Sequence, residues 1–404
     1  MSQILLITIS GEDHPGVTAG ITAILSRHNV NILDIGQAVI HATLSMGVLA
    51  ELPGGCDREV VSAEVERCGQ EQGMRVRIAE VSADSYGHWV AAQGRARYIV
   101  TLLARKITAD QIARVTEVIS RHALNIDSIN RLSGRIPLGD LPDLSRACVE
   151  FSVRGPLAEM STFRRDLLEV AGALEVDLAF QQDNMYRRNR RLVAFDMDST
   201  LIEAEVIDEL AARAGVGPQV AAITERAMRG ELDFSASFRE RVALLHGLDE
   251  AVLEEVASDL KITEGAEHLI STLRTLGYKT AILSGGFTYF ARYLQARLGM
   301  DFVHANDLDI EGGKVTGKVT GTIVDGERKA QLLRQLADSE GIDLQQVIAV
   351  GDGANDLPML STAGLGIAFR AKPLVQKSAE QSISTLGLDA ILYLLGFSDR
   401  DQQR

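Results

Sequence analysis

Three short apolar runs in the second half of the chain, each ending abruptly in polar residues, most constrain its fold. They are residues 192–195 before Asp196, residues 280–283 before Ser284, and residues 347–350 before Gly351. Long stretches of helical pattern separate these runs, and strands that alternate with helices are typical of a parallel, doubly wound α/β sheet. Ligands bind beyond the carboxyl ends of the strands in such sheets, so the three polar segments are expected to meet in one crevice.

Two carboxylates one residue apart, Asp196 and Asp198, directly follow the first run. Their mutual repulsion is costly unless a cation lies beside them. We therefore interpret Asp196 as a nucleophile and Asp198 as its acid/base partner, with a divalent metal ion that offsets the charge. An isolated Asp-x-Asp is more often a solvated turn, so the interpretation depends on the other two segments.

The acidic turn over residues 351–356 supplies further oxygen ligands. Asp352, together with Asp196 and the main-chain carbonyl of Asp198, forms a set of hard oxygen ligands that suits Mg²⁺. Asp356 is predicted to orient metal-bound water from outside the coordination sphere. Taken alone, the turn would fit a Ca²⁺ loop or an Asx turn equally well.

An anion site is predicted from two further features. Ser284, Gly285 and Gly286 offer a hydroxyl group and exposed main-chain N–H groups. Lys329 begins a helical pattern; such a lysine is usually solvated, but here we interpret it as the charge that neutralises a phosphoryl group. These groups suit phosphoryl transfer from a monoester to the aspartate nucleophile. The second aspartate would protonate the leaving alkoxide and then activate water.

The N-terminal half contains an internal repeat: residues 26–35 match residues 120–129, an offset of 94 residues. Each copy shows the order β-α-β-β-α-β of a ferredoxin-like α+β unit. We expect the two copies to form domains over residues 1–83 and 95–183, with a polar linker over residues 83–94.

Composition narrows the class of protein. The 404-residue chain has a formal net charge of −14, which disfavours nucleic acid and anionic membranes as partners. We interpret the basic run over residues 187–191 as a solvated interdomain joint. The cysteines Cys56, Cys68 and Cys148 lack metal-like spacing and indicate free thiols in a reducing cytosol. No signal peptide and no apolar span of the ~20 residues needed to cross a bilayer is evident, so a cytoplasmic location is expected.

The motifs D-x-D-x-T, S-G-G, a helix-initial lysine and G-D-G-x-N-D, in this order, resemble those of haloacid dehalogenase superfamily phosphatases. Within that superfamily, the segments beginning at Ala194, Thr224, Ile282 and Val350 resemble the phosphoserine phosphatases. The resemblance implies a haloacid dehalogenase-like domain over residues 190–396 with a helical cap at about 205–261. It also implies Mg²⁺-dependent hydrolysis of O-phospho-L-serine through a phosphoaspartyl intermediate, the last step of serine biosynthesis.

The same resemblance implies roles for residues that the motifs leave unassigned. Glu205 would bind the substrate ammonium and Arg241 its carboxylate, Met228 and Phe234 would form an apolar cap wall, and Asn355 would contact the phosphate. Two alternatives stay open: a phosphatase or phosphotransferase acting on another small phosphomonoester, and an amino-acid-sensing regulatory protein with a vestigial phosphatase fold.

The two N-terminal repeats resemble ACT domains, which bind amino acids in regulatory proteins. The resemblance implies an effector loop at Asp13–Gly16, with Asp13 and Gly16 near the effector and a further polar contact from Asn31. L-serine is the suggested effector, and pairing of ACT domains implies a homo-oligomer. The aligned loop of the second copy, residues 106–110, lacks the D-x-P-G pattern, so this copy is expected to serve mainly in dimerisation.

Overall fold

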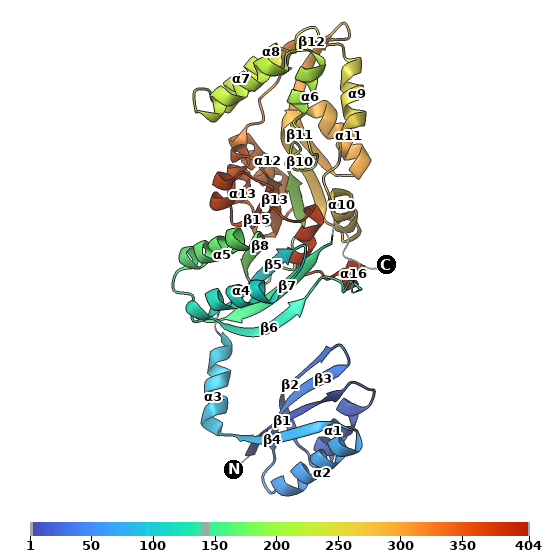
Figure 1. Cartoon of the computed structure of the whole chain (residues 1–404), viewed down its shortest axis with the longest axis vertical. Coiled ribbons are helices and arrows are strands. Elements are labelled where there is room, and N and C mark those ends of the chain that lie inside the picture. Colours follow the sequence, from blue (N-terminus) through green and yellow to red (C-terminus); the bar gives the residue numbers. More distant parts are fainter. Residues whose placement is uncertain (1–2, 95, 138, 140–144, 403–404) are drawn as a thin grey trace. The chain divides into compact units, whose positions relative to one another are not determined.

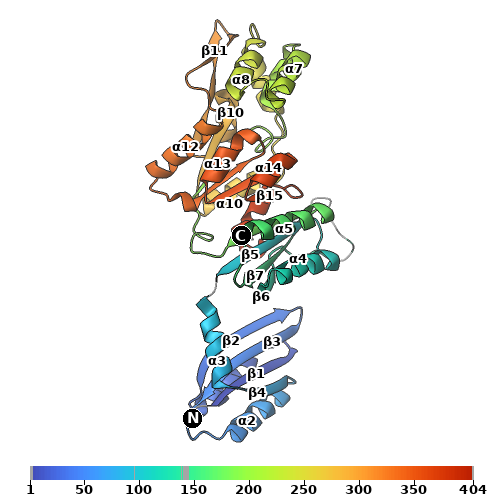
Figure 2. The ribbon, with the colours of Figure 1, turned by 90° about the vertical axis from the view of Figure 1, so that its left-hand side faces the viewer.

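The computed structural model of the chain describes residues 3–94, 96–137, 139 and 145–402. The chain divides into two compact units, Met1–Arg95 and Ala96–Arg404, whose elements are labelled in Figures 1 and 2. No helix within the described ranges is both long and apolar enough to cross a membrane.

The first unit is a ferredoxin-like sheet with two helices packed against it. Its elements are β1 (Gln3–Glu12), α1 (Val17–Arg27), β2 (Asn31–Ile40), β3 (Thr43–Leu52), α2 (Arg58–Glu71) and β4 (Arg75–Val81). The strands are antiparallel in the order β2-β3-β1-β4. Alternate residues of β1 (Leu5, Ile7 and Ile9) are buried in the core under α1 and α2, as the period of a half-buried strand requires. The predicted β-α-β-β-α-β order is confirmed.

The segment predicted as a linker is helical. Helix α3 (Ala83–Ala91) follows β4 and continues into a 3₁₀ turn, η1 (Ala92–Gly94). The Ser82 hydroxyl caps α3 by accepting a hydrogen bond of 3.1 Å from the Ser85 N–H, and Asp84 lies in the first turn, where a negative charge favours the helix.

The second repeat has the same order of helices and strands as the first. Its elements are β5 (Arg97–Ala104), α4 (Ala109–Arg121), β6 (Asn125–Arg131), β7 (Ala147–Arg154), α5 (Met160–Leu174) and β8 (Asp177–Gln182), in the strand order β6-β7-β5-β8. After the first helix of each repeat, Asn29 and Ala123 adopt the left-handed conformation with φ of 53° and 56°. Such a residue ends a helix and redirects the chain into the next strand.

The C-terminal part of the second unit is built on a mainly parallel sheet. Its strands are β9 (Leu192–Phe195), β10 (Lys279–Phe287), β11 (Phe302–Glu311), β12 (Lys314–Thr320), β13 (Val347–Gly351), β14 (Leu365–Phe369) and β15 (Gln381–Ile383). The order is β12-β11-β10-β9-β13-β14-β15, and only the hairpin β11–β12 is antiparallel among these described pairs.

Helices cover both faces of this sheet, as the predicted doubly wound fold requires. In β9, Val193 and Phe195 pack in the core that contains α10 (Ala266–Thr275) and α11 (Thr288–Leu298). Leu192 and Ala194 pack in the opposite core. That core contains α12 (Gly326–Ser339) and α13 (Leu357–Thr362). Three short helices follow toward the C-terminus: α14 (Pro373–Ser378), α15 (Ile391–Leu394) and α16 (Asp399–Gln402).

A helical insertion separates β9 from β10. It comprises α6 (Val206–Arg213), α7 (Gly217–Met228), α8 (Phe234–Ala243) and α9 (Ala251–Asp259). Helices α7 and α8 lie at the same end of the sheet as the β11–β12 hairpin (Figures 1 and 2). We refer to this insertion as the cap.

The second repeat and the C-terminal sheet share a continuous interface. The Gln381 side chain bonds the main chain of Phe180 in β8 twice, accepting from its N–H (2.8 Å) and donating to its carbonyl (2.5 Å). Asp177 accepts hydrogen bonds of 2.8 and 2.7 Å from the N–H groups of Ser384 and Thr385. Buried Cys148 of β7 lies in the same hydrophobic core as the C-terminal helices, so the second repeat is part of the unit that carries the parallel sheet.

The prediction that the basic run is a solvated joint is wrong for two of its arginines. Arg187 is fully buried and forms an ion pair with Glu150 of β7. Arg190 is 8% exposed and donates to the main-chain carbonyl of Gln345. Burial of these charges depends on such partners, which lie far away in sequence and which composition does not reveal.

We expect Arg187→Met to lower the free energy of unfolding by about 3 kcal/mol or more, because it leaves the buried Glu150 carboxylate without its partner. Chemical denaturation of the full chain measures this loss. The double variant Arg187→Met/Glu150→Leu removes both charges and should recover most of it. Equal losses in the single and double variants would contradict this role.

Candidate active site

The ends of β9, β10 and β13 lie side by side. Phe195, the last residue of β9, pairs with Ile282 of β10 on one side and with Val350 of β13 on the other. Asp196 therefore enters the crevice between the Ser284 segment and the acidic turn. The strand register thus brings together three segments that are far apart in sequence.

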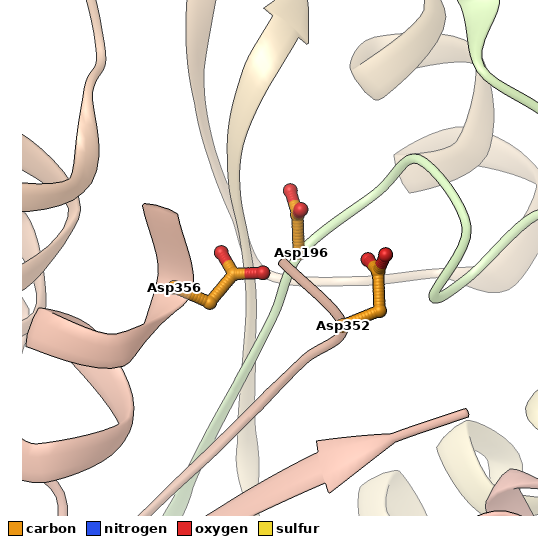
Figure 3. Close-up of side chains that lie close together, drawn as sticks. All are labelled: Asp196, Asp352 and Asp356. Carbon is orange, nitrogen blue, oxygen red and sulfur yellow. The ribbon is translucent and has the colours of Figure 1, made fainter. Parts of the chain in front are cut away.

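Three carboxylates gather at these strand ends. One oxygen from each of Asp196, Asp352 and Asp356 lies within 4.8 Å of the others, and Figure 3 shows Asp196 between the other two. Burial first, and then the charges of Asp356 and Glu205, raise the pKa of Asp352 to about 7. A divalent cation would relieve this repulsion, and hard oxygen ligands at this spacing fit Mg²⁺.

A buried lysine ties two of these carboxylates together. Lys329 is fully buried in the first turn of α12, and its Nζ lies 2.8 Å from Oδ1 of Asp196 and 2.6 Å from Oδ1 of Asp356. Burial alone would lower the pKa of Lys329, but the two carboxylates raise it above its ordinary value, so the ammonium stays charged. The other oxygen of Asp356 accepts the Gly353 N–H at 2.9 Å, which leaves Asp356 better placed to orient the site than to bind a metal directly.

The two aspartates of the D-x-D motif have different surroundings. Burial, followed by the Asp356 charge, raises the pKa of Asp196 well above its ordinary value, and Lys329 opposes this shift. Burial and the nearby Glu205 raise the pKa of Asp198 to about 8. A carboxyl group with that pKa carries a proton at neutral pH, as a general acid must. Oδ1 of Asp198 accepts the Val206 N–H at 3.0 Å, which fixes its orientation at the start of the cap.

The Ser284–Gly286 segment closes the other side of the crevice. The buried Ser284 hydroxyl accepts the Gly286 N–H at 2.9 Å, which leaves its own proton available to an anion. A Cβ atom at Gly286 would lie 2.5 Å from Oδ2 of Asp198, and one at Gly285 would lie 2.7 Å from the Phe234 ring. A larger residue at either position would displace the neighbouring side chain, so close approach favours glycine at both.

The cap contributes an aromatic wall and an arginine. Phe234 stacks on Phe238 with ring centroids 5.9 Å apart, and Phe238 contacts Phe287 at the end of β10. Burial lowers the pKa of Arg241, while the charges of Asp208, Glu205 and Asp198 raise it. Nε of Arg241 donates to the Ser237 carbonyl at 3.4 Å. Since no carboxylate among the described residues forms an ion pair with Arg241, the rest of the guanidinium can receive an anionic ligand.

The remaining predicted substrate residues lie around this crevice in different environments. Glu205 is exposed, and its Oε1 accepts the Ser199 hydroxyl at 2.8 Å. Asn355 is partly buried in the acidic turn, beside Gly353. Met228 is 66% exposed at the end of α7, so its role in a cap wall stays a prediction.

The predicted effector residues do not form one cluster within a single chain. Gly16, with φ of 106°, precedes α1, and Asp13 lies in the same loop. Asn31 follows the other end of this 11-residue helix, about 16 Å along its axis, and donates to Glu51 at 3.3 Å.

Two residues that support the site were missed by sequence reasoning. The buried Thr200 hydroxyl donates to Oδ1 of Asp352 at 3.2 Å; its place in the D-x-D-x-T motif was a usable signal. Asn306, buried in β11, donates to the Gly285 carbonyl at 2.8 Å and so holds the Ser284–Gly286 segment in place. No sequence signal distinguishes Asn306, because its strand also contains His304, Asp307 and Asp309.

Comparisons with known proteins agree with this geometry. A family model for haloacid dehalogenase-like hydrolases matches residues 190–364, and an ACT domain model matches residues 3–79. A phosphoserine phosphatase of Streptomyces coelicolor is 42% identical over 98% of this chain and 92% of its own length. The phosphoserine phosphatase SerB2 of Mycobacterium tuberculosis is 39% identical over 97% of this chain and 93% of its own length.

Solved structures show the same relationship. A haloacid dehalogenase family hydrolase from Salmonella enterica serovar Typhi matches with a TM-score of 0.64 and 32% identity, over 74% of this chain and 98% of that one. A probable phosphoserine phosphatase from Vibrio cholerae matches with a TM-score of 0.59 and 36% identity, over 75% and 87% of the two chains. The chain is a phosphoric monoester hydrolase, and it belongs to the phosphoserine phosphatase family of haloacid dehalogenase-like hydrolases with N-terminal ACT domains.

Proposed function

We propose that this enzyme hydrolyses O-phospho-L-serine to L-serine and phosphate, with Mg²⁺ as cofactor and through a phosphoaspartyl intermediate. The observation that carries the proposal is the placement of Asp196 beside the buried Lys329 ammonium, 2.8 Å away, at the strand ends that also hold Ser284 and Asp352. The activity for which the nearly full-length relatives are named supports the choice of substrate.

The residues around Asp196 would have different roles in the reaction. Asp196 and Asp352, with the main-chain carbonyl of Asp198, would hold Mg²⁺, which when bound supplies positive charge to the phosphoryl oxygens and keeps Asp196 ionised. Lys329 and Ser284 would bind the remaining phosphoryl oxygens.

Asp198 would act twice. Protonated at first, it would donate its proton to the serine alkoxide as the P–O bond breaks and the bond to an Asp196 oxygen forms. The resulting carboxylate would then take a proton from the water that attacks the phosphoaspartate, which releases phosphate and restores both aspartates. The Val206 N–H at 3.0 Å holds this side chain in one orientation throughout.

Substrate selection would come from groups at the mouth of the crevice. Arg241 would bind the serine carboxylate and Glu205 its ammonium, because an amino-acid phosphate offers one group of each sign. Phe234 would cover the substrate from the cap side, with Met228 in the same wall, and Asn355 would contact the phosphate. These roles are proposals that rest on position and family resemblance.

The N-terminal repeats would make the enzyme responsive to an amino acid, with L-serine as the suggested effector. Asp13 and Gly16 lie at the opposite end of α1 from Asn31, so one effector contacting all three would need a second copy of the chain, which supports a homo-oligomer. We place the domains at residues 1–83, 95–183 and 190–396. The free cysteines support a cytoplasmic location.

Another small phosphomonoester as substrate, or transfer to an acceptor alcohol, is the second candidate. The exposed position of Glu205 favours it, since an exposed carboxylate selects an ammonium group less strictly than a buried one. A panel of phosphoserine, phosphothreonine and sugar phosphates separates the two candidates.

Phosphate release from O-phospho-L-serine should be rapid with Mg²⁺ and should stop with excess EDTA, because the proposed metal ion is needed to keep the Asp196 carboxylate charged among its acidic neighbours. A colorimetric phosphate assay measures both conditions, and re-addition of Mg²⁺ serves as the control. Release that persists in EDTA would overturn the metal-dependent mechanism, and the absence of release in Mg²⁺ would overturn the choice of substrate.

Arg241→Met should lower kcat/KM for O-phospho-L-serine by about 10- to 100-fold, because it removes a charge-assisted contact with the carboxylate. The same variant should retain its rate on O-phosphoethanolamine, which has the ammonium but no carboxylate. Steady-state kinetics on both substrates give the comparison. Equal losses on both would show that Arg241 does not recognise the carboxylate.

Replacing Gly16 by Val should abolish the response of the rate to millimolar L-serine. The left-handed φ of 106° is strained for a β-branched residue, so the effector loop must change shape. The ratio of rates with and without serine is the measurement. A ratio equal to that of the wild type would assign the serine effect to product inhibition at the active site.

A further inference from the structure

The chain enters and leaves the cap through two adjacent segments, residues 199–205 and 260–264, which we call the hinge. They run antiparallel and pair at Ile202 and Ile262. Two hydrogen bonds of 3.0 Å join them, from the Glu203 N–H to the Lys261 carbonyl and from the Thr263 N–H to the Leu201 carbonyl. Any movement of the cap relative to the sheet must bend or twist these two segments.

The side chain at the end of the hinge, Glu264, is held from two sides. Arg105 of the second repeat binds it with both guanidinium nitrogens, Nη1 to Oε1 and Nη2 to Oε2, each at 2.8 Å. Arg370, which follows β14, donates to Oε2 at 2.8 Å and also lies 3.7 Å from Glu203. The hydrogen bonds from Arg105 lower the pKa of Glu264, and both partners of this pair are less than one-third exposed, so solvent screens the pair less than a surface ion pair.

Main-chain contacts also hold Glu264 in place. The Glu264 carbonyl accepts the Leu388 N–H at 2.8 Å. Gly265, the next residue, has φ of 80°, and a Cβ there would lie 2.4 Å from Oδ1 of Asp389. The main chain at Glu264 is therefore anchored to the C-terminal segment. The side-chain carboxylate of Glu264 is the group that the second repeat contacts.

The position of Arg105 in the second repeat can be compared with the equivalent position in the first. It directly follows β5, and the 94-residue offset aligns it with Gly11 of the first repeat. The loop that comes next, residues 106–110, aligns with the predicted effector loop of the first repeat. In the first repeat that loop is predicted to bind a free amino acid; in the second, the arginine beside it binds the carboxylate of Glu264.

Arg105 is itself held in place by the chain that precedes β7. The Ser145 hydroxyl donates to the Arg105 carbonyl at 2.8 Å, and Nη1 of Arg105 lies 3.4 Å from the Ser145 carbonyl. The guanidinium is thus oriented before it meets Glu264, as an effective bidentate contact requires.

We propose that Arg105 is a positioning residue for the phosphatase reaction: the second repeat holds the hinge of the cap through Glu264 instead of binding a free effector at this loop. The proposal rests on the proposed function, because it assigns cap position a role in turnover of the phosphomonoester. It gives the second repeat a task within its own chain, in addition to the expected dimerisation.

The test compares Arg105→Met with the wild type, because methionine keeps the apolar stem and removes the charge. Hydrogen exchange at the Glu203 and Thr263 amides, which make the two hinge hydrogen bonds, should become faster. For O-phospho-L-serine, kcat/KM should fall about fivefold, as expected when a cap equilibrium shifts by the loss of one charged contact. Arg105→Lys, which keeps one charged contact, should recover part of both effects.

Arg164→Met is the matched control. Arg164 lies on α5 of the same repeat, is 31% exposed, and pairs across the same interface with Glu380 at 3.5 Å, away from the hinge. It should change neither hinge exchange nor kinetics. If Arg105→Met folds poorly, Glu264→Gln removes the Arg105 ion pair from the hinge side, together with the Arg370 pair, and should also give faster exchange.

Unchanged hinge exchange in both Arg105→Met and Glu264→Gln would overturn the proposal, and so would an equal change in Arg164→Met. Exchange at the hinge is read without substrate. A wild-type enzyme inactive on phosphoserine would therefore refute the proposed function and leave the hinge result intact.

Discussion

The buried Lys329 ammonium between Asp196 and Asp356 is the interaction on which the rest of the site depends. It joins the first turn of α12 to the end of β9, which lies more than a hundred residues earlier in the chain, and to the acidic turn after β13, where Asp356 lies 27 residues after Lys329. Without the lysine, two buried carboxylates would lose their nearest positive charge; without the carboxylates, a fully buried ammonium would be uncompensated. The three groups therefore persist only as a set, and this set fixes Asp196, the proposed nucleophile.

Around this set the fold arranges parts that differ in rigidity. The sheet is covered on both faces, so the strand ends hold Asp196, Ser284 and Asp352 on a rigid frame. The cap, which carries Phe234 and Arg241, is connected to that frame by two chain crossings and by main-chain hydrogen bonds to the β11–β12 hairpin, among them Gly247 N–H to the Val315 carbonyl at 2.8 Å. The proposed reacting groups thus lie on the sheet and the proposed substrate-selecting groups on the cap, and Arg105 of the second repeat contacts Glu264 at the base of the cap.

Much of this arrangement could be predicted from the sequence, because it is encoded locally. Strand patterns that end in Asp196, Ser284 and Gly351 predict both the parallel sheet and the crevice, and the repeat predicts two ferredoxin-like units. What could not be predicted depends on partners distant in sequence. From the sequence alone, Arg187 is interpreted as solvated and nothing marks Arg105 as more than a loop residue. Their partners, Glu150 and Glu264, become neighbours only in the folded chain.

The residue that supports the Ser284–Gly286 segment could not be predicted for a related reason. Asn306 has a function only because β11 lies beside β10, which brings its amide to the Gly285 carbonyl. Family resemblance supplied Asn31 and Gly16 as one effector site, whereas a single chain separates them by the length of α1. Local patterns therefore predicted which polar groups lie at the strand ends, and the three-dimensional structure was needed to find what holds them.

The most direct test of the central claim is to locate the phosphoryl group during turnover. The enzyme is mixed with O-phospho-L-serine and Mg²⁺, quenched in acid within one turnover, digested and analysed by mass spectrometry. The account predicts a phosphoryl group on the peptide that contains Asp196, and specifically on Asp196 rather than Asp198. Turnover with the phosphoryl group on another residue, or with none on the protein while the serine product forms in a burst, would contradict it.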